Sequence, residues 1–294
     1  NQPANVNFDG HFGDAKLAIT GTAGPLTPTF DMDIAVTLDT ESVAAFAPLA
    51  GMDLPDIGPL SVSIKLTGKG GKYAASDLIT TLDDQNVTVE AKGSVADLAA
   101  LSGLELEAKV DADQLTQILK AMGYQSEHPL PDTLDATIEM SGSLKDLAVP
   151  RFQTKIRGQG LHITGSGEAK NITTLEGVKA DLLLEAESLD GIAEIAKAKL
   201  PPLGPLKATA GIVSKGKNLD LIEIKADLTS KIIHADVAGS IGDPLKLKDV
   251  NAKVNLGVNS FAWLADYVKM KLPPLGQLKA SAKITSKGDV LGLE

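Results

Sequence analysis

The 294-residue chain combines 43% hydrophobic residues with only 3% aromatic residues and a net charge of −10. This apolar content indicates a folded interior built from Ala, Val, Ile and Leu, and it argues against disorder. The 28 Lys and Arg residues are scattered, whereas nucleic-acid binding requires a clustered cationic face. The absence of Cys excludes disulfides and thiol catalysis. The sequence contains no run of about 18 apolar residues, so it predicts no transmembrane helix.

Short helices are predicted where apolar residues recur at i, i+3, i+4 and i+7. The four segments are 43–50, 115–122, 189–196 and 261–268. Ser42, Ser188 and Ser260 directly precede three of these segments, where a hydroxyl can cap the first turn. The remaining helix follows Gln114, and Asp113 is available there as a cap.

A related phrase follows each predicted helix: LPDIGP from Leu54, LPDTLD from Leu130, LPPLGP from Leu200 and LPPLGQ from Leu272. The 20-residue stretches that begin at Leu200 and Leu272 are identical at 14 positions. Proline lacks an N–H and ends a helix, while glycine lets the chain reverse into a strand. The phrase therefore predicts a structural joint and not a ligand loop. Its joint residues are Pro55, Gly58, Pro201, Pro202, Gly204, Pro273, Pro274 and Gly276.

After each joint the apolar period changes from 3.6 to 2, which predicts strands with one apolar face. These stretches begin at Leu60, Leu134, Leu206 and Leu278. Three further alternating stretches follow the third joint, over 222–228, 233–237 and 250–256, with Ile222 and Ile224 expected on the apolar side. The short connections favour an antiparallel meander.

A repeat of about 72 residues is predicted, because the joints and a set of four glycines keep the same spacing. These glycines are Gly21, Gly93, Gly167 and Gly239. The expected fold is mainly β: a repeated antiparallel meander, curled into an elongated hydrophobic groove, with short α-helices at the joints. We expect 1–294 to be one continuous array, with partial units at 1–38 and 257–294 and full units at 39–110, 111–185 and 186–256. Since no end carries a capping unit, the chain is expected to be a fragment of a longer protein.

Metal-ligand spacing is absent around the four histidines, which are His11, His128, His162 and His234. His162 and His234 stand at matching polar positions of strands, which favours solvent-facing side chains over metal ligands. We therefore predict no metal site.

Paired carboxylates at Asp31 and Asp33 and at Asp111 and Asp113 could support acid–base chemistry. A solvated strand edge and a helix cap explain these two pairs better, because no nucleophile accompanies them. GKGGKY at 68–73 lacks the spacing of a phosphate loop and predicts a hairpin turn. We predict no catalytic residue, no cofactor and no enzymatic activity.

The alternation predicts an apolar sheet face that four short helices cannot cover, because about sixteen strands span roughly 75 Å at ~4.8 Å each. Either a ligand covers this face or the sheet curls until it seals itself. Burial of a 16-carbon acyl chain at ~0.8 kcal/mol per methylene would contribute on the order of 12 kcal/mol before ordering costs. The candidate lipid-binding residues are Leu60, Val62, Ile64, Leu66, Val87, Val89, Leu104, Leu106, Leu134, Ile138, Leu161, Ile163, Leu206, Ile212, Ile233, Val237, Val250, Val254, Leu278 and Ile284.

The helix, the joint LPPLGPLKATA, the meander and the strand IHADVAGSIG resemble the repeated C-terminal region of the AsmA-like family, most clearly over 186–292. Members of that family are similar to bridge-like lipid-transfer proteins. The resemblance implies non-enzymatic passage of phospholipid or another acyl lipid between the inner and outer membranes of a Gram-negative envelope. It implies a periplasmic location, an inner-membrane anchor outside this fragment and envelope protein partners. LPDTLD lacks the Gly-Pro of the other joints, so that joint is expected to differ.

A second hypothesis needs only the stacked repeat and its polar outer face. On this hypothesis the protein is a structural or interaction scaffold of the periplasm that holds partners apart without a lipid conduit.

Overall fold

The computed structural model describes residues 3–25, 30–46, 54–121, 124, 131–196, 203–216, 218–244, 248–259, 277–287 and 290–293. Over these residues the protein is mainly β, with antiparallel strands that pair in chain order and few helices. This confirms the predicted fold class at the level of an antiparallel meander. The chain divides into two compact units, Asn1–Ser126 with Asp132–Gln153, and Glu127–Pro131 with Thr154–Glu294.

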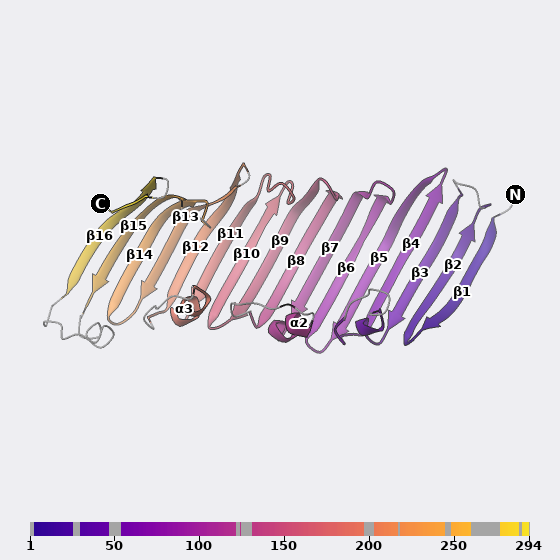
Figure 1. Ribbon diagram of the computed structural model, residues 1–294, viewed down its shortest axis with the longest axis horizontal. Helices are drawn as coiled ribbons and strands as arrows, with labels where there is room; N and C mark the ends of the chain where they lie inside the picture. The colour runs from indigo at the N-terminus through magenta and orange to yellow at the C-terminus, as the bar shows by residue number, and fades with distance from the viewer. Residues whose placement is uncertain are drawn as a thin grey trace. The chain divides into compact units, whose positions relative to one another are not determined.

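The first unit is a meander in which Figure 1 shows strands β1 to β8 side by side in chain order. Its strands are β1 (Ala4–Phe12), β2 (Ala15–Ala23), β3 (Met32–Thr40), β4 (Leu60–Lys69), β5 (Lys72–Asp84), β6 (Val87–Asp97), β7 (Ser102–Ala112), β8 (Thr133–Ser143) and the first part of β9 (Leu147–Gly158). A 3-10 turn, η1 (Val43–Phe46), precedes β4, and helix α2 (Leu115–Ala121) precedes β8.

The second unit is also an antiparallel meander. Its strands are the last part of β9, β10 (Leu161–Ala169), β11 (Lys179–Ala186), β12 (Leu206–Lys215), β13 (Asn218–Thr229), β14 (Ile233–Gly242), β15 (Lys248–Val258), β16 (Leu278–Lys287) and β17 (Val290–Leu293). Helix α3 (Asp190–Ala196) connects β11 to β12, and Figure 1 shows it at one end of these strands.

The helices fall where the apolar period predicts them. α2 and α3 agree with the segments predicted over 115–122 and 189–196 to within one residue at each end. The segment predicted over 43–50 forms only the four-residue η1 in the described residues, and 47–50 lie outside them. The segment predicted over 261–268 also lies outside the described residues.

Each of the three joints within the described residues accepts a hydrogen bond from the first residue of its predicted helical segment. The backbone N–H of Val43 donates to Ile57 O at 2.8 Å, and that of Leu189 donates to Leu203 O at 2.7 Å. At the LPDTLD joint the N–H of Leu115 donates to a carbonyl oxygen in the same way, at 2.8 Å. These bonds satisfy N–H groups that have no partner inside a helix.

Serine caps complete two of these helix starts, as predicted. Ser42 Oγ accepts the N–H of Ala44 at 3.1 Å, and Ser188 Oγ accepts the N–H of Asp190 at 3.2 Å. The second helix begins after Gln114 instead, which has a positive φ of 53° and whose carbonyl oxygen accepts the N–H of Gln117 at 2.7 Å.

The joint glycines are required because the backbone passes too close for a side chain. A Cβ on Gly58 would overlap Glu41 O, and a Cβ on Gly204 would overlap Glu187 O. Only Gly58 has a positive φ, of 157°, so close approach and not turn geometry is the shared reason. Pro55 precedes Gly58 and is buried. The joint residues Pro201, Pro202, Pro273, Pro274 and Gly276 lie outside the described residues.

Many buried residues lie at the helical ends of the strands, and others, such as Ala75 and Ala169, lie toward the opposite ends. The last strand residue before each helical segment is buried, whether it is Thr40 at 4% exposed, Ala112 at 2% or Ala186 at 4%. In the first unit a cluster forms around Leu82, Val87 and Ala112. Partly buried side chains from η1, the joint, α2 and the strands pack against this cluster: Val43, Ile57, Leu60, Val89, Leu115, Ile118 and Leu134.

One strand departs from the predicted alternation. The pairing of β13 with β12 and β14 contains a bulge, and Glu223 within it has a positive φ of 51°. Leu221 therefore pairs with Ile212, while Ile222 pairs with Gly211 and turns to the polar side. The prediction that Ile222 shares a face with Ile224 is wrong, because an inserted bulge residue inverts the alternation on one side of it.

Candidate functional site

The cross-strand register places the apolar residues of each unit on one face of its sheet, because directly opposed residues point to the same side. In the first unit this apolar face runs through Leu38, Val62 and Thr80 to Ala91 and Ala108. The single hydroxyl among these five residues is that of Thr80. The opposite face of the same strands is polar.

The second unit has the same arrangement. A cross-strand row of its apolar face runs from Ala208 and Ala226 through Val237 and Val254 to Ala282. Each residue of this row directly opposes the next one on the neighbouring strand. The apolar face therefore continues without interruption from β12 to β16.

All twenty candidate lipid-binding residues lie on strands, and the register places each on the apolar face of its unit. The first unit holds ten of them on β4, β6, β7 and β8, and the second unit holds ten on β10, β12, β14, β15 and β16. Four of these residues, Leu60, Val87, Val89 and Leu134, belong to the cluster under η1 and α2. These four line the covered margin of the apolar face and not its centre.

The centre of the apolar face is only partly buried. Ile34, Val36 and Leu38 of β3 are each of intermediate exposure, although the burial pattern of the strand alternates as expected for one-sided packing. Among the described residues, no large side chain is less than 2% exposed. Phe8 and Phe12 on the same face of β1 are 50% and 48% exposed. Single exposed apolar residues are common on proteins and need no explanation, whereas a contiguous apolar face of this extent does.

The four glycines of the predicted spacing share one environment. Each directly opposes a residue of the next strand: Gly21 opposes Ile34, and Gly239 opposes Ala252. A Cβ on any of the four would overlap a backbone carbonyl oxygen of that strand, namely that of Asp33, Glu105, Lys179 or Asn251. A strand glycine of this kind marks a tight bend or a close backbone approach. The sheet of each unit thus carries recurring positions where no side chain fits on its apolar face.

Aromatic residues border the first unit's apolar face at the end opposite to the helices. The Tyr73 ring lies over Gly68, its direct partner across β4 and β5. Its ring centroid is 5.8 Å from that of Phe30, and its hydroxyl donates to Phe30 O at 3.4 Å. This pair was not predicted from the sequence. The signal that could have identified it is the aromatic residue two positions after the Gly70–Gly71 turn, opposite a strand glycine.

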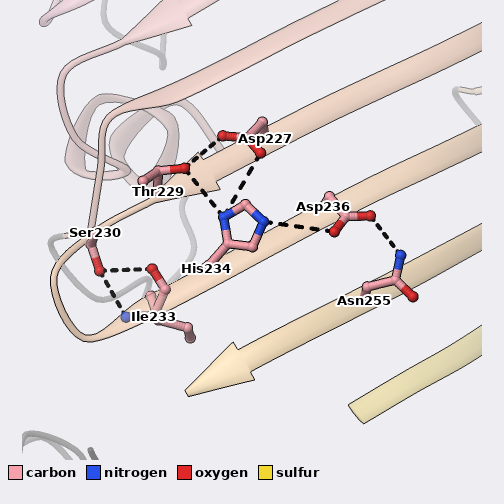
Figure 2. Close-up of polar contacts among 7 residues, drawn as sticks. All are labelled: Asp227, Thr229, Ser230, Ile233, His234, Asp236 and Asn255. Atoms are coloured by element: carbon pink, nitrogen blue, oxygen red, sulfur yellow. Dashed lines mark hydrogen bonds and ion pairs between the residues drawn. The ribbon is translucent and has the colours of Figure 1, made fainter. Parts of the chain in front are cut away.

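On the polar face, His234 contacts side chains of the neighbouring strands. Figure 2 shows His234 between Asp227 and Asp236, with ring nitrogens 3.8 Å from one carboxylate oxygen of each. Thr229 Oγ1 donates to Asp227 at 2.7 Å, and Asn255 Nδ2 donates to Asp236 at 2.6 Å. These contacts join β13, β14 and β15, and the His234 side chain is 53% exposed. The histidine is a solvent-facing strand residue, as predicted.

The candidate carboxylates Asp31 and Asp33 also have structural partners. Asp33 pairs with Lys65 at 3.2 Å, and Asp31 accepts the N–H of Gly70 at 3.1 Å in the predicted β4–β5 turn. Lys207 donates to Glu185 at 2.8 Å, and this hydrogen bond and positive charge lower the pKa of that carboxyl group. Within the described part of the chain, no group of three His, Asp or Glu side chains could hold a metal ion.

The chain matches no protein-family model, no curated protein and no solved structure. Among the described residues, no helix has the length and hydropathy needed to cross a membrane.

Proposed function

We propose that the apolar faces bind the acyl chains of phospholipid or another acyl lipid, without catalysis, along a groove formed by the curled, repeated meander. The observation that carries this proposal is the wide apolar face that the described helices leave partly exposed. An acyl chain is a suitable occupant because it is apolar and long, and because it needs no directional contacts.

The distribution of side chains supports a slot-like site. Helical segments and joints cover one margin of the first unit's face, and Phe30 and Tyr73 border the other. The recurring glycines remove side chains from the apolar face at regular intervals, and strand glycines of this kind allow a sheet to curl. The proposed curl would lift both margins above the centre. An extended chain could then lie across successive strands.

The resemblance to the AsmA-like family supplies the setting of the proposal. In that setting the lipid passes between the inner and outer membranes, and the protein works in the periplasm with an anchor outside residues 1–294. Envelope proteins would be its partners at either end. A periplasmic scaffold without a lipid conduit is the outcome to expect if the apolar face takes up no acyl chain.

Uptake of a fluorescent phospholipid by the delipidated chain tests the proposal. Val237 and Val254 are directly opposed on β14 and β15, so Val237→Asp with Val254→Asp places two carboxylates in the proposed groove. We expect this variant to lose most uptake. The matched control is Thr209→Asp, since Thr209 follows Ala208 of the same cross-strand row but is exposed on the polar face. Equal uptake by the folded double variant and by the control would refute the groove assignment, and no uptake by the unmodified chain would favour the scaffold.

A further inference from the structure

A hollow of about 530 Å³ lies on the polar face of the second unit, over β14, β15 and β16. Lys253 and Lys283 line it from directly opposed positions of β15 and β16. Asn251 and Ser281 add polar side chains to the lining, while Ala238 contributes only a methyl group on one side of the hollow. The hollow thus combines two cations with hydrogen-bonding groups.

Among the described residues, the lining of this hollow includes no carboxylate that balances its positive charge. Lys225 extends the same cross-strand row, because it opposes Ala238, which in turn opposes Lys253. Like charges at directly opposed positions destabilise a sheet. In the described part of the chain, the ion pairs found do not include Lys225, Lys253 or Lys283.

The nearest acidic row is already engaged. Asp227 and Asp236 directly oppose each other on β13 and β14, next to the lysine row. Asp227 accepts from Thr229, and Asp236 accepts from Asn255. Figure 2 shows both carboxylates turned toward His234.

The first unit has a hollow that partly corresponds to this one, over β5 to β8, and its lining carries equal numbers of acidic and basic residues. Gly93 opposes Leu106 as Gly239 opposes Ala252, which aligns the two units strand by strand. By this alignment Glu107 stands where the second unit has Lys253. Lys92 pairs with Glu107 at 3.0 Å across the hollow of about 340 Å³.

The next strand of the first unit is neutralised in the same way. Glu139 stands where the second unit has Lys283, and Arg151 pairs with Glu139. Paired charges of this kind are what we expect on a strand surface that only contacts solvent.

We propose that the second unit's hollow is a binding site for a phosphate group. A phosphate group offers several acceptor oxygens and up to two negative charges, so it can accept from both ammonium groups and from the Asn251 amide at once. The volume of the hollow lies within the usual range for small-molecule sites. The site is on the face opposite to the proposed acyl groove, so it does not depend on lipid binding there.

Titration of the full chain with inorganic phosphate, followed by amide chemical shifts, tests the site directly. We expect saturable shifts centred on Asn251, Lys253, Ser281 and Lys283. Lys253→Gln with Lys283→Gln should weaken binding by on the order of tenfold or more, because each charge-assisted hydrogen bond contributes a factor of that size. Lys92→Gln, in the first unit's hollow, is the matched control and should leave phosphate binding unchanged.

A second arm identifies the source of the phosphate group. Vesicles of phosphatidylglycerol and vesicles of phosphatidylcholine are compared with the soluble anion, each against the unmodified chain and the double lysine variant. Retention on the anionic vesicles that the lysine variant loses assigns a lipid headgroup, and binding of soluble phosphate alone assigns a free anion. Unsaturable shifts, or equal binding by the double lysine variant, would overturn the proposal.

Discussion

The polar hollows of the two units share the aligned positions of Glu107 and Lys253 and differ in charge. In the first unit Lys92 and Glu107 neutralise each other, and in the second Lys253 faces Lys283. The backbone around them is the same in one respect, because Gly93 and Gly239 both oppose the neighbouring strand too closely for a Cβ. Identical backbone positions can therefore carry different surface chemistry.

This difference separates two kinds of constraint. Where two strands lie very close, a Cβ atom would overlap the backbone of the neighbouring strand, so both units have glycine at the same place. Exposed side chains on a strand contribute little to stability, so substitution there is tolerated and charge can change between units. Features shared by the units therefore report on folding, whereas the charges that differ between them are not required by the fold.

The largest expected effect concerns the shared glycines. Gly93→Ala and Gly239→Ala should each lower the free energy of unfolding by about 1–3 kcal/mol, because the new methyl group overlaps a backbone carbonyl oxygen. Chemical denaturation measures the change. Gly257→Ala is the control, since its Cβ would lie 3.8 Å from the nearest atom, His234 O. A loss confined to one unit would contradict the claim that the two units share this constraint.

Removing the opposed lysines tests the second unit's hollow. Lys283→Glu places a carboxylate directly opposite Lys253 and should raise the free energy of unfolding by about 0.2–1 kcal/mol at low salt. Lys283→Gln removes the repulsion without adding an attraction, so its gain should be smaller. Equal stability of the unmodified chain and Lys283→Glu at low salt would show that the two lysines do not interact.

The first unit's hollow should respond in the opposite direction. Lys92→Gln removes the pair with Glu107 and should lower the free energy of unfolding by about 0.2–1 kcal/mol, a small value because both side chains are exposed. Lys72→Gln is the control, since Lys72 is exposed and directly opposes Lys69 and not an acidic residue. The effect of Lys92→Gln should shrink in 1 M salt, and a salt-independent loss would point to packing.

The smallest effect concerns Glu185. Its pKa is lowered by the Lys207 hydrogen bond and charge, so its contribution to stability is present at neutral pH and is lost as the pH falls through the acid range. Lys207→Gln should return the pKa of Glu185 toward its usual value. A side-chain carboxyl titration followed by NMR measures this, and an unchanged pKa in the variant would rule out Lys207 as the cause.

The alternation of apolar residues was sufficient to predict the strands, and the switch of period was sufficient to predict α2 and α3. Both patterns are local, because a side chain's face follows from its position in the strand or helix. The bulge at Glu223 could not be predicted, since Ile222 and Ile224 continue the pattern and the inversion arises from pairing with β12 and β14. The same applies to Tyr73, whose place over Gly68 depends on the register of β4 with β5.

The candidate site, too, could be predicted only in part from the sequence. The sequence was sufficient to select twenty apolar strand residues, all of which lie on the apolar faces, because the period of two sorts side chains between faces. The sequence could not distinguish the covered margin of the apolar face, which includes Val87, from its open centre. The helices and joints that cover the margin are distant in the chain from the strand residues that they cover. The sequence also could not identify the lysine hollow, since Lys253 and Lys283 are 30 positions apart in the sequence.

The amino-acid sequence by itself determined the class of structure, the positions of the joints and the division of each strand into an apolar and a polar side. These follow from local preferences of proline, glycine and alternating side chains, which act over a few neighbouring residues. Only the tertiary structure decided which glycines are obligatory, which apolar residues are covered and which lysines oppose each other. These depend on the register between strands, which brings together atoms from distant parts of the chain.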